Sequence, residues 1–337
     1  DEKPVLKNVN LSLPTGSLTL ITGRTGSGKS TLLKVIHARK PGCAFVNQFP
    51  REGFVANTVY EELAFALVQQ QKSRREIDSR VSDEASKFEL QGFLSADPQS
   101  LSAGFQQRVA IASTLIADAK VLLLDEPFSA IDIPTRQTLY QTLAELRKRL
   151  HIPIILVTHD LREAHLLADR ITVIDQGVGL QTANANDLFA KPRNARVAQL
   201  VGIPNLFQGV FNAGRLQWGS SPWAFQITDK GKIPPQSQVA WVIPQAGLSV
   251  HSTSQDGRIP CRVKHISALG QIAVIEFVIE AIAETLTWEA SAAEVRRLGL
   301  EQAALVYLEF NCDLIHIMPL RPINDPRRFM SAADAAP

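Results

Sequence analysis

The stretch Gly23-Arg24-Thr25-Gly26-Ser27-Gly28-Lys29-Ser30-Thr31 decides the first half of the fold. It fits the pattern G-x-x-x-x-G-K-[ST], in which a glycine-rich loop follows a buried strand and opens a helix. The apolar run Leu18–Thr22 directly before it has the length of such a strand. The glycines let several backbone N–H groups point at one anion, and the helix that begins at Lys29 adds the positive end of its dipole. These residues therefore predict an α/β core that binds the phosphates of a nucleoside triphosphate.

Two side chains of this loop have expected roles of their own. Lys29 is placed to reach the β- and γ-phosphates, and the Ser30 hydroxyl is a ligand for Mg²⁺. The alternative is a glycine- and serine-rich surface turn with an unrelated lysine. The strand before the loop and the apolar helix after it favour the nucleotide-binding interpretation.

The composition is that of a globular protein with room for two domains. The chain has 337 residues, of which 45% are apolar and 20% are charged. It contains no run of about 18 apolar residues and no signal-peptide pattern at its start, so we expect it on the cytosolic side. A net charge of +2 does not favour nucleic acid as a partner. The cysteines Cys43, Cys261 and Cys312 show no metal or redox spacing and are interpreted as buried free thiols.

Residues 1–203 alternate short apolar runs with helical patterns, which is typical of a sheet covered by helices. The strands are expected at residues 18–22, 43–47, 121–125, 154–158 and 171–175. A block of about residues 58–117, rich in Glu, Gln, Lys, Arg and Ala, is predicted to be a helical subdomain. Leucines at helical spacing after Pro134 predict an amphipathic helix that packs on the sheet.

From residue 204 the pattern changes to short alternating strands separated by Gly, Pro, Asp and Ser. This predicts a small all-β domain over residues 204–322, built as one barrel or as two barrel-like halves. Two segments each open with a strand, at residues 206–211 and 260–266, and close with an apolar one, at residues 239–243 and 304–310. This similarity raises the hypothesis of an internal repeat. Residues 323–337 are predicted to be a loose tail.

Two carboxylates, Asp125 and Glu126, follow the apolar run at residues 121–124. Asp125 stands at a strand end beside the phosphate loop and is expected to hold Mg²⁺ through water. Glu126 is placed to polarise a water molecule for attack on the γ-phosphate. An apolar strand that ends in Asp-Glu is common by itself, and the phosphate loop upstream is what favours this interpretation.

A second anion-binding helix start is predicted at Leu101-Ser102-Ala103-Gly104-Phe105-Gln106-Gln107-Arg108. Ser102 can cap the helix that runs from there to about residue 117. The alternative is a helix cap with no further role. The chain thus has one phosphate loop and one further helix start that can bind an anion. The simplest explanation is a head-to-tail pair of two subunits. In such a pair, the helix start of one subunit meets the γ-phosphate bound to the other.

Taken together and in this order, the motifs resemble those of the ATP-binding subunits of ABC transporters. Ser129-Ala130-Ile131-Asp132 matches the D-loop of that family, and Thr158-His159-Asp160 matches its switch histidine. Gln48, which ends the expected strand Phe45-Val46-Asn47, matches the Q-loop glutamine. The resemblance covers essentially all of residues 1–203 and implies a phosphate-loop ATPase core with a helical subdomain, followed by an OB-like β domain.

The resemblance also assigns roles to residues. It implies that His159 contacts the γ-phosphate and holds the catalytic geometry, beside Glu126. It implies that Gln48 contacts Mg²⁺ and the attacking water, so the expected metal ligands are Ser30, Asp125 and Gln48. The residues expected to act across the dimer are Ser102, Ala103, Gly104 and Asp132. ATP and Mg²⁺ are the implied cofactors.

The signature departs from the family pattern, which is usually Leu-Ser-Gly-Gly-Gln. This chain has Ala103 and Phe105 at two of those positions. Ser102 and Gly104, which approach phosphate in the family, are both present. We therefore expect a competent site with an altered affinity across the dimer.

Two further departures concern the start of the chain. The aromatic residue that stacks on adenine in this family would lie upstream of Asp1, so no base-stacking residue is assigned. The span from Lys29 to Gln48 is too short for the β-hairpin usually found there. Either the hairpin is absent or a loop is missing from the sequence as it stands.

The β region favours an importer. Residues 204–209 and 241–244 resemble the OB-like regulatory domain of importers of sugars, polyamines and inorganic ions. Residues 58–65 instead resemble the ATPases of energy-coupling-factor importers of vitamins and metals, and we favour the first subclass because its domain is physically present. The implied partners are a second ATPase subunit, identical or related, transmembrane permease subunits docked near residues 48–66, and a substrate-binding protein. The chain is then peripheral on the cytoplasmic side of the cell membrane.

Two other functions stay open. A soluble ABC-type ATPase acting on nucleic acid or ribosomes would use the β region as a binding module. That region shows no basic and aromatic pattern of the kind that single strands require. A regulatory ATP sensor without hydrolysis would rest only on the altered signature. The favoured interpretation is an ATP-hydrolysing importer subunit that binds no nucleic acid.

Overall fold

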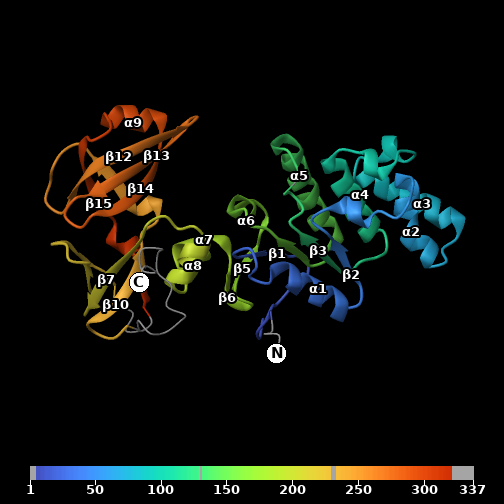
Figure 1. Cartoon of the computed structure of the whole chain (residues 1–337), viewed down its shortest axis with the longest axis horizontal. Helices are drawn as coiled ribbons and strands as arrows, with labels where there is room; N and C mark the ends of the chain where they lie inside the picture. The colour runs from blue at the N-terminus through green and yellow to red at the C-terminus, as the bar shows by residue number, and fades with distance from the viewer. Residues whose placement is uncertain (1–4, 130, 229–232, 321–337) are drawn as a thin grey trace. The chain divides into compact units, whose positions relative to one another are not determined.

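The computed structural model describes residues 5–129, 131–228 and 233–320. It divides into two compact units, Asp1–Ala185 and Asn186–Pro337, and Figure 1 labels many of their elements. The predicted tail at residues 323–337 lies outside the described residues. Within the described part of the chain, no helix is both long and apolar enough to cross a membrane.

Among the described residues, the first unit forms a six-stranded sheet in the order β2-β3-β4-β1-β5-β6. Its strands are β1 (Leu18–Thr22), β2 (Cys43–Val46), β3 (Val121–Asp125), β4 (Ile154–Val157), β5 (Arg170–Asp175) and β6 (Val178–Ala183). Strands β1 to β5 run parallel and confirm the predicted strands to within one residue at either end. The sequence pattern did not predict β6, which pairs antiparallel with β5 at the edge. The carboxyl ends of β1, β3 and β4 therefore meet at one edge of the sheet.

Helices α1 (Lys29–Arg39), α5 (Ile133–Leu150) and α6 (Leu161–Leu167) cover the sheet, with α1 on the side opposite to α5 and α6 in Figure 1. The buried leucines of α1, Leu32 and Leu33, pack with apolar residues of β1, β3, β4 and β5. The leucine spacing predicted for α5 is confirmed, because Leu139, Leu143 and Leu146 are buried. Helices on both faces explain why β1 and β4 are buried along their whole length.

The helical block contains α2 (Val59–Gln69), α3 (Arg74–Lys87) and α4 (Ala103–Leu115), with the 3₁₀ turns η1 (Pro50–Gly53), η2 (Gln91–Phe93) and η3 (Pro98–Ser100). Thr58 and Ser73 cap α2 and α3, because each side chain accepts a hydrogen bond from the N–H three residues on. Helix α4 buries most of its side chains and contacts both α2 and β2. It therefore joins the block to the sheet.

Helices α7 (Ala185–Ala190) and α8 (Ala195–Leu200) lead into the β region. Ala195 and Ala198 of α8 pack with Ala240, Val242 and Met318, which belong to that region. The domain boundary after residue 203 stays a prediction, since both helices lie between it and the division at Ala185.

The β region consists of β7 (Leu206–Asn212), β8 (Arg215–Trp218), β9 (Ala224–Gln226), β10 (Ser237–Val242), η4 (Gln245–Gly247), β11 (Leu248–His251), β12 (Ile259–Leu269), β13 (Ile272–Ile279), β14 (Glu284–Ser291), α9 (Ala292–Leu298), β15 (Leu305–Phe310), η5 (Cys312–Leu314) and β16 (His316–Pro319). Its described strands form two antiparallel five-stranded sheets, β16-β10-β7-β8-β9 and β11-β15-β12-β13-β14.

These strand orders confirm the hypothesis of an internal repeat. The order β10-β7-β8-β9 in the first sheet corresponds strand by strand to β15-β12-β13-β14 in the second. Both sheets therefore have the same topology. The outer strands are exchanged between the halves. Strand β11 follows the first half but joins the second sheet, and β16 follows the second half but joins the first.

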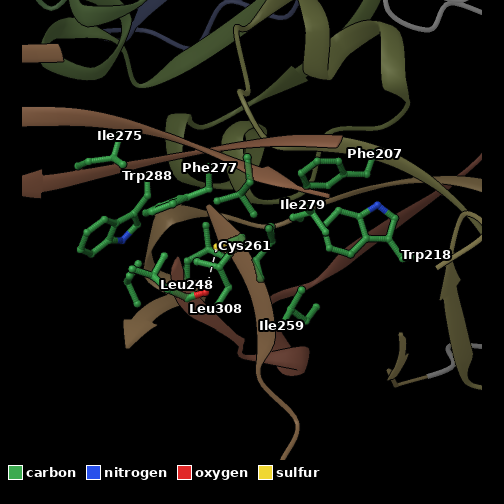
Figure 2. Packing of buried hydrophobic residues seen from close by; sticks show 14 of the residues in the cluster. Phe207, Trp218, Leu248, Ile259, Cys261, Ile275, Phe277, Ile279, Trp288 and Leu308 are labelled. Atoms are coloured by element: carbon green, nitrogen blue, oxygen red, sulfur yellow. Dashed lines mark hydrogen bonds between the residues drawn. The ribbon is translucent and has the colours of Figure 1, made fainter. Parts of the chain in front are cut away.

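The two sheets share one hydrophobic core. Figure 2 shows Phe207 and Trp218 of the first sheet in the same cluster as Phe277 and Trp288 of the second. Strand β13 buries every second residue, which is the pattern expected of a strand with one face on a core. The predicted halves are therefore not separate bodies.

The prediction of buried cysteines is correct for only one of the three. All are free thiols, but Cys43 and Cys312 are only half-buried because Cys43 opens a strand and Cys312 lies in a surface turn. Cys261 is buried, and its burial raises the pKa of the thiol to about 12.

Candidate functional site

The phosphate loop, residues 23–31, connects β1 to α1 at the carboxyl edge of the sheet. Gly28 precedes α1 with a φ of +101°, a conformation that residues with side chains rarely adopt. Gly23 is required for space, since a Cβ there would lie 2.0 Å from the carbonyl oxygen of Ile174. The glycines thus let the loop pass close to β5 and turn directly into the helix.

The Lys29 side chain is folded into this loop. Its Nζ donates to the carbonyl oxygens of Gly23 at 2.9 Å and Arg24 at 3.1 Å, and the residue is 6% exposed. Burial lowers the pKa of Lys29, while the charges of Glu126 and Asp125 act in the opposite direction. An ammonium group held among backbone groups of the loop is placed to bind an anion that enters it.

Ser30 and Asp125 come together from α1 and the end of β3. The Ser30 hydroxyl donates to Asp125 Oδ1 at 3.0 Å. Burial raises the pKa of the Asp125 carboxyl, and the hydrogen bond from Ser30 partly offsets this. Hydroxyl and carboxylate oxygens suit Mg²⁺, which commonly takes its other ligands from phosphates and water. Within the described ranges, no group of three or more His, Cys, Asp or Glu residues could hold a metal ion.

Glu126 and His159 form a second pair, from the ends of β3 and β4. His159 Nδ1 lies 3.1 Å from Glu126 Oε2, and the side chains are 68% and 21% exposed respectively. Glu126 has a φ of +45°, which is uncommon outside glycine and frequent at functional sites. The pair is open to the surface beside the phosphate loop and can orient a water molecule.

Gln48 lies two residues beyond the end of β2 and is half-buried. Its Nε2 donates to Ser129 Oγ at 3.4 Å, and Ser129 Oγ donates to the carbonyl oxygen of Glu126 at 3.0 Å. Gln48 is thus linked through Ser129 to the backbone of the proposed base. Ala130, the second residue of the predicted D-loop, lies outside the described residues.

The residues predicted to act across a dimer lie at the starts of α4 and α5. Ser102 occupies the cap position of α4, but its hydroxyl makes no capping hydrogen bond, so that prediction is wrong. The helix begins instead with the Ser102 carbonyl oxygen, which accepts from the Gln106 N–H at 2.9 Å. Ser102 and Ala103 are exposed, whereas Gly104 is buried.

The ABC transporter family model matches residues 6–129. Over 330 residues, the chain is 31% identical to the sulfate/thiosulfate import ATP-binding protein CysA of Bacillus cereus, covering 90% of this chain and 91% of that protein. The chain belongs to the ATP-binding subunits of ABC transporters. It is also 34% identical over 230 residues to the spermidine/putrescine import ATP-binding protein PotA of Clostridioides difficile, covering 62% of this chain and 66% of PotA.

Among solved structures, cbiO1 of Clostridium perfringens, part of the ABC transporter complex cbiONQ, is similar with a TM-score of 0.52. The two are 27% identical, and the match covers 58% of this chain and 88% of cbiO1. The match with CysA covers 90% of this chain and so extends into the second unit. The chain is therefore an ABC importer ATPase, and its β region is shared with import subunits of similar length.

This ABC ATPase also contains a buried carboxylate that the sequence did not predict. Glu62 on α2 is 7% exposed and accepts hydrogen bonds from the N–H groups of Val55 at 2.9 Å and Ala56 at 3.0 Å. It fixes the segment between Gln48 and α2. The only sequence signal is its place in the run at residues 58–65, whose pattern gives no partner for it.

The aromatic residue in the signature has a structural explanation. The Phe105 ring lies 4.5 Å from the Phe93 ring between centroids, and the Arg108 guanidinium carbon lies 5.3 Å from the centre of the Phe105 ring. Arg108 in turn pairs with Glu89. Phe105 therefore packs inside its own helical block, where the usual glutamine would be a poorer fit.

Proposed function

We propose that this ABC ATPase works as a head-to-tail pair, in which residues 23–31 of one subunit and the start of α4 of the other enclose each ATP. The observation that carries the proposal is the exposure of Ser102 and Ala103 at a helix start, with the Ser102 hydroxyl not used as a cap. A helix start offers unpaired N–H groups to an anion. Asp132, exposed at the start of α5, would meet the same partner. The partner is a second copy or a related subunit.

Glu126 is the proposed general base for hydrolysis. It takes a proton from water as the water oxygen attacks the γ-phosphorus and the bond to the bridging oxygen breaks. His159 holds the carboxylate in place, and Gln48 orients the water. Mg²⁺ would be held by Ser30, Asp125 and Gln48, and when bound it supplies positive charge that stabilises the phosphate oxygens.

A membrane permease is the proposed partner of the helical block. Large apolar side chains are exposed on either side of η1 and on α2: Phe49 at 50%, Val55 at 66%, Phe65 at 47% and Val68 at 59%. Exposed apolar side chains can contribute to a protein contact site. Because Gln48 adjoins Phe49, a permease docked here would sense the nucleotide site. The chain would then be peripheral on the cytoplasmic face of the membrane, with a substrate-binding protein serving the same importer.

The transported solute is proposed to be selected by the permease and any capture protein. Relatives of similar identity are named as sulfate/thiosulfate and as spermidine/putrescine importers, whose solutes carry opposite charge. A common ATPase architecture therefore serves chemically different solutes.

The shared site is tested by mixing two disabled variants, both in the Glu126→Gln background so that bound ATP persists. Lys29→Ala removes the cation of the phosphate loop, and Ser102→Arg places a bulky group at the exposed start of α4. A mixed pair then has one intact composite site, whereas a pair of either variant alone has none. We expect light scattering to detect an ATP-dependent dimer in the Glu126→Gln parent and in the mixture. A dimer of either variant alone, or none in the parent, would contradict the shared site.

A further inference from the structure

One side chain in the first turn of α5, Thr135, touches both proposed cross-dimer elements. Its main-chain N–H and its hydroxyl donate to Asp132 Oδ2, at 3.2 and 3.0 Å. Its methyl carbon, Cγ2, faces Gly104 at the start of α4. Asp132 and Gly104 therefore depend on the same residue for their relative placement.

The hydroxyl of Thr135 fixes the direction of its methyl group. A β-branched side chain has few favourable χ1 rotamers, and the hydrogen bond to Asp132 selects one of them. The hydrogen bonds from Thr135 also lower the pKa of Asp132, so they favour its charged form. The methyl group is thus held toward α4 for as long as the Asp132 contact persists.

Gly104 provides the space that this methyl group occupies. A Cβ at position 104 would lie 2.2 Å from Thr135 Cγ2 and 3.6 Å from Thr135 Cβ, and the first distance is too short for two carbons. Gly104 lies inside α4, so its backbone is helical and the glycine is needed for space, not for conformation. The space left by the missing side chain is used by the same subunit.

We propose that Thr135 is a positioning residue that sets the spacing between Asp132 and the start of α4, and that its methyl group is the reason for a glycine at position 104. This inference rests on the proposed shared site, because the spacing matters to function only if both elements meet one partner. With the spacing fixed, Asp132 and residues 102–104 reach the partner together when the subunits close.

The test exchanges one methyl group between the two positions. Gly104→Ala adds a carbon where Thr135 Cγ2 lies. Thr135→Ser removes Cγ2 and keeps the hydroxyl, so the double variant restores the volume at the contact. Thr135→Val keeps the shape of the side chain and removes the hydroxyl.

Thermal unfolding of the nucleotide-free chain reports on the contact itself. We expect Gly104→Ala to lower Tm by about 3 °C or more, because overpacking a close contact is destabilising. The double variant should recover at least half of that loss. If it recovers nothing, Thr135 is not what requires the glycine, and the inference is overturned.

ATP-dependent dimerisation in the Glu126→Gln background reports on positioning. Gly104→Ala should raise the ATP concentration for half-maximal dimer by about tenfold, and the double variant should return to within about threefold of the parent. Thr135→Val should raise it by about threefold, since Asp132 loses a hydrogen bond. Binding of ATP to dilute monomer should not change in any of them, which separates positioning from loss of the fold.

Three outcomes distinguish a failure of this inference from a failure of the shared site on which it rests. If the double variant regains its Tm but not its dimerisation, or if Thr135→Val dimerises as the parent does, Thr135 has no positioning role. If the Glu126→Gln parent forms no dimer with ATP, the shared site fails first and the positioning role fails with it.

Discussion

At the scale of single residues, Glu126 combines a left-handed backbone with a histidine partner 3.1 Å away. Glu126→Gln keeps the size of the side chain and removes its basicity, so we expect ATP hydrolysis to fall by about 100-fold or more. ATP binding should persist because the phosphate loop is unchanged. Phosphate release and binding of a fluorescent ATP analogue measure the two effects. Glu145→Gln, exposed on α5, is the control, and equal turnover in both variants would remove Glu126 from the base role.

Lys29 differs from the other lysines of its surroundings in being buried within the loop. Lys29→Ala removes the ammonium group that is proposed to bind phosphate, and we expect the affinity for ATP to fall by about tenfold to 100-fold. The matched control is Lys40→Ala, which changes an exposed lysine just after α1. Equilibrium binding of ATP checks the prediction, and undiminished affinity in Lys29→Ala would argue against the loop as the phosphate site.

The sequence predicted residues whose chemistry is carried by a local motif. The phosphate loop, Asp125-Glu126 and His159 each follow a short apolar strand, and parallel pairing brings those strand ends together. Thr135 and Glu62 were not predicted, because each makes its contacts with residues outside its own helix. The role proposed for Thr135 depends on its contact with Gly104, and no local pattern encodes that contact.

At the scale of elements, α4 can be tested through its unusual signature residue. Phe105→Gln restores the common family residue but loses the contacts with Phe93 and Arg108. We expect it to lower the free energy of unfolding by about 1 kcal/mol while ATP hydrolysis continues. Thermal unfolding measures the loss. In Phe93→Leu, where the ring partner is already gone, the same change should cost less, and equal costs in both backgrounds would exclude the ring pair as the reason.

Buried strands were predicted from the sequence, whereas an exposed edge strand and two short helices were not. Strands β1, β3 and β4 are short apolar runs because helices cover both faces, and such runs were recognised. Strand β6 was missed because it lies at the edge of the sheet and is largely exposed. Its residues, which include a glycine, do not alternate between apolar and polar. Helices α7 and α8, six residues each, are too short to show a helical period.

At the scale of the whole molecule, the β region depends on contacts that no local pattern reveals. The exchange of β11 and β16 joins segments far apart in sequence. Strand β14 is the edge of its sheet, and the buried Asn205 binds it as a neighbouring strand would. Asn205 Nδ2 donates to the Thr287 carbonyl oxygen and its Oδ1 accepts from the Thr287 N–H, both at 2.8 Å. The sequence of residues 204–209 shows only a family pattern, which does not reveal the hydrogen bonds between Asn205 and Thr287.

The division into two units, each with its own core, leads to a prediction about unfolding. Asn205→Asp removes the donor to Thr287 and places a carboxylate against a carbonyl oxygen at a residue that is 1% exposed. This should cost about 2 to 4 kcal/mol, which lowers the Tm of the second unit by about 5 °C or more. Asn212→Asp, at the exposed end of β7, should have little effect.

Calorimetry with and without ATP assigns the two transitions. ATP binds the first unit and should raise only that transition, because a ligand stabilises the state that binds it. Asn205→Asp should therefore lower the transition that ATP leaves unchanged, and the ATP-dependent shift of the other should equal that of the parent. If ATP raises both transitions together, or if the variant lowers the ATP-dependent one equally, the units unfold as one. Nucleotide binding would then be coupled to the β region by a free energy that the same experiment measures.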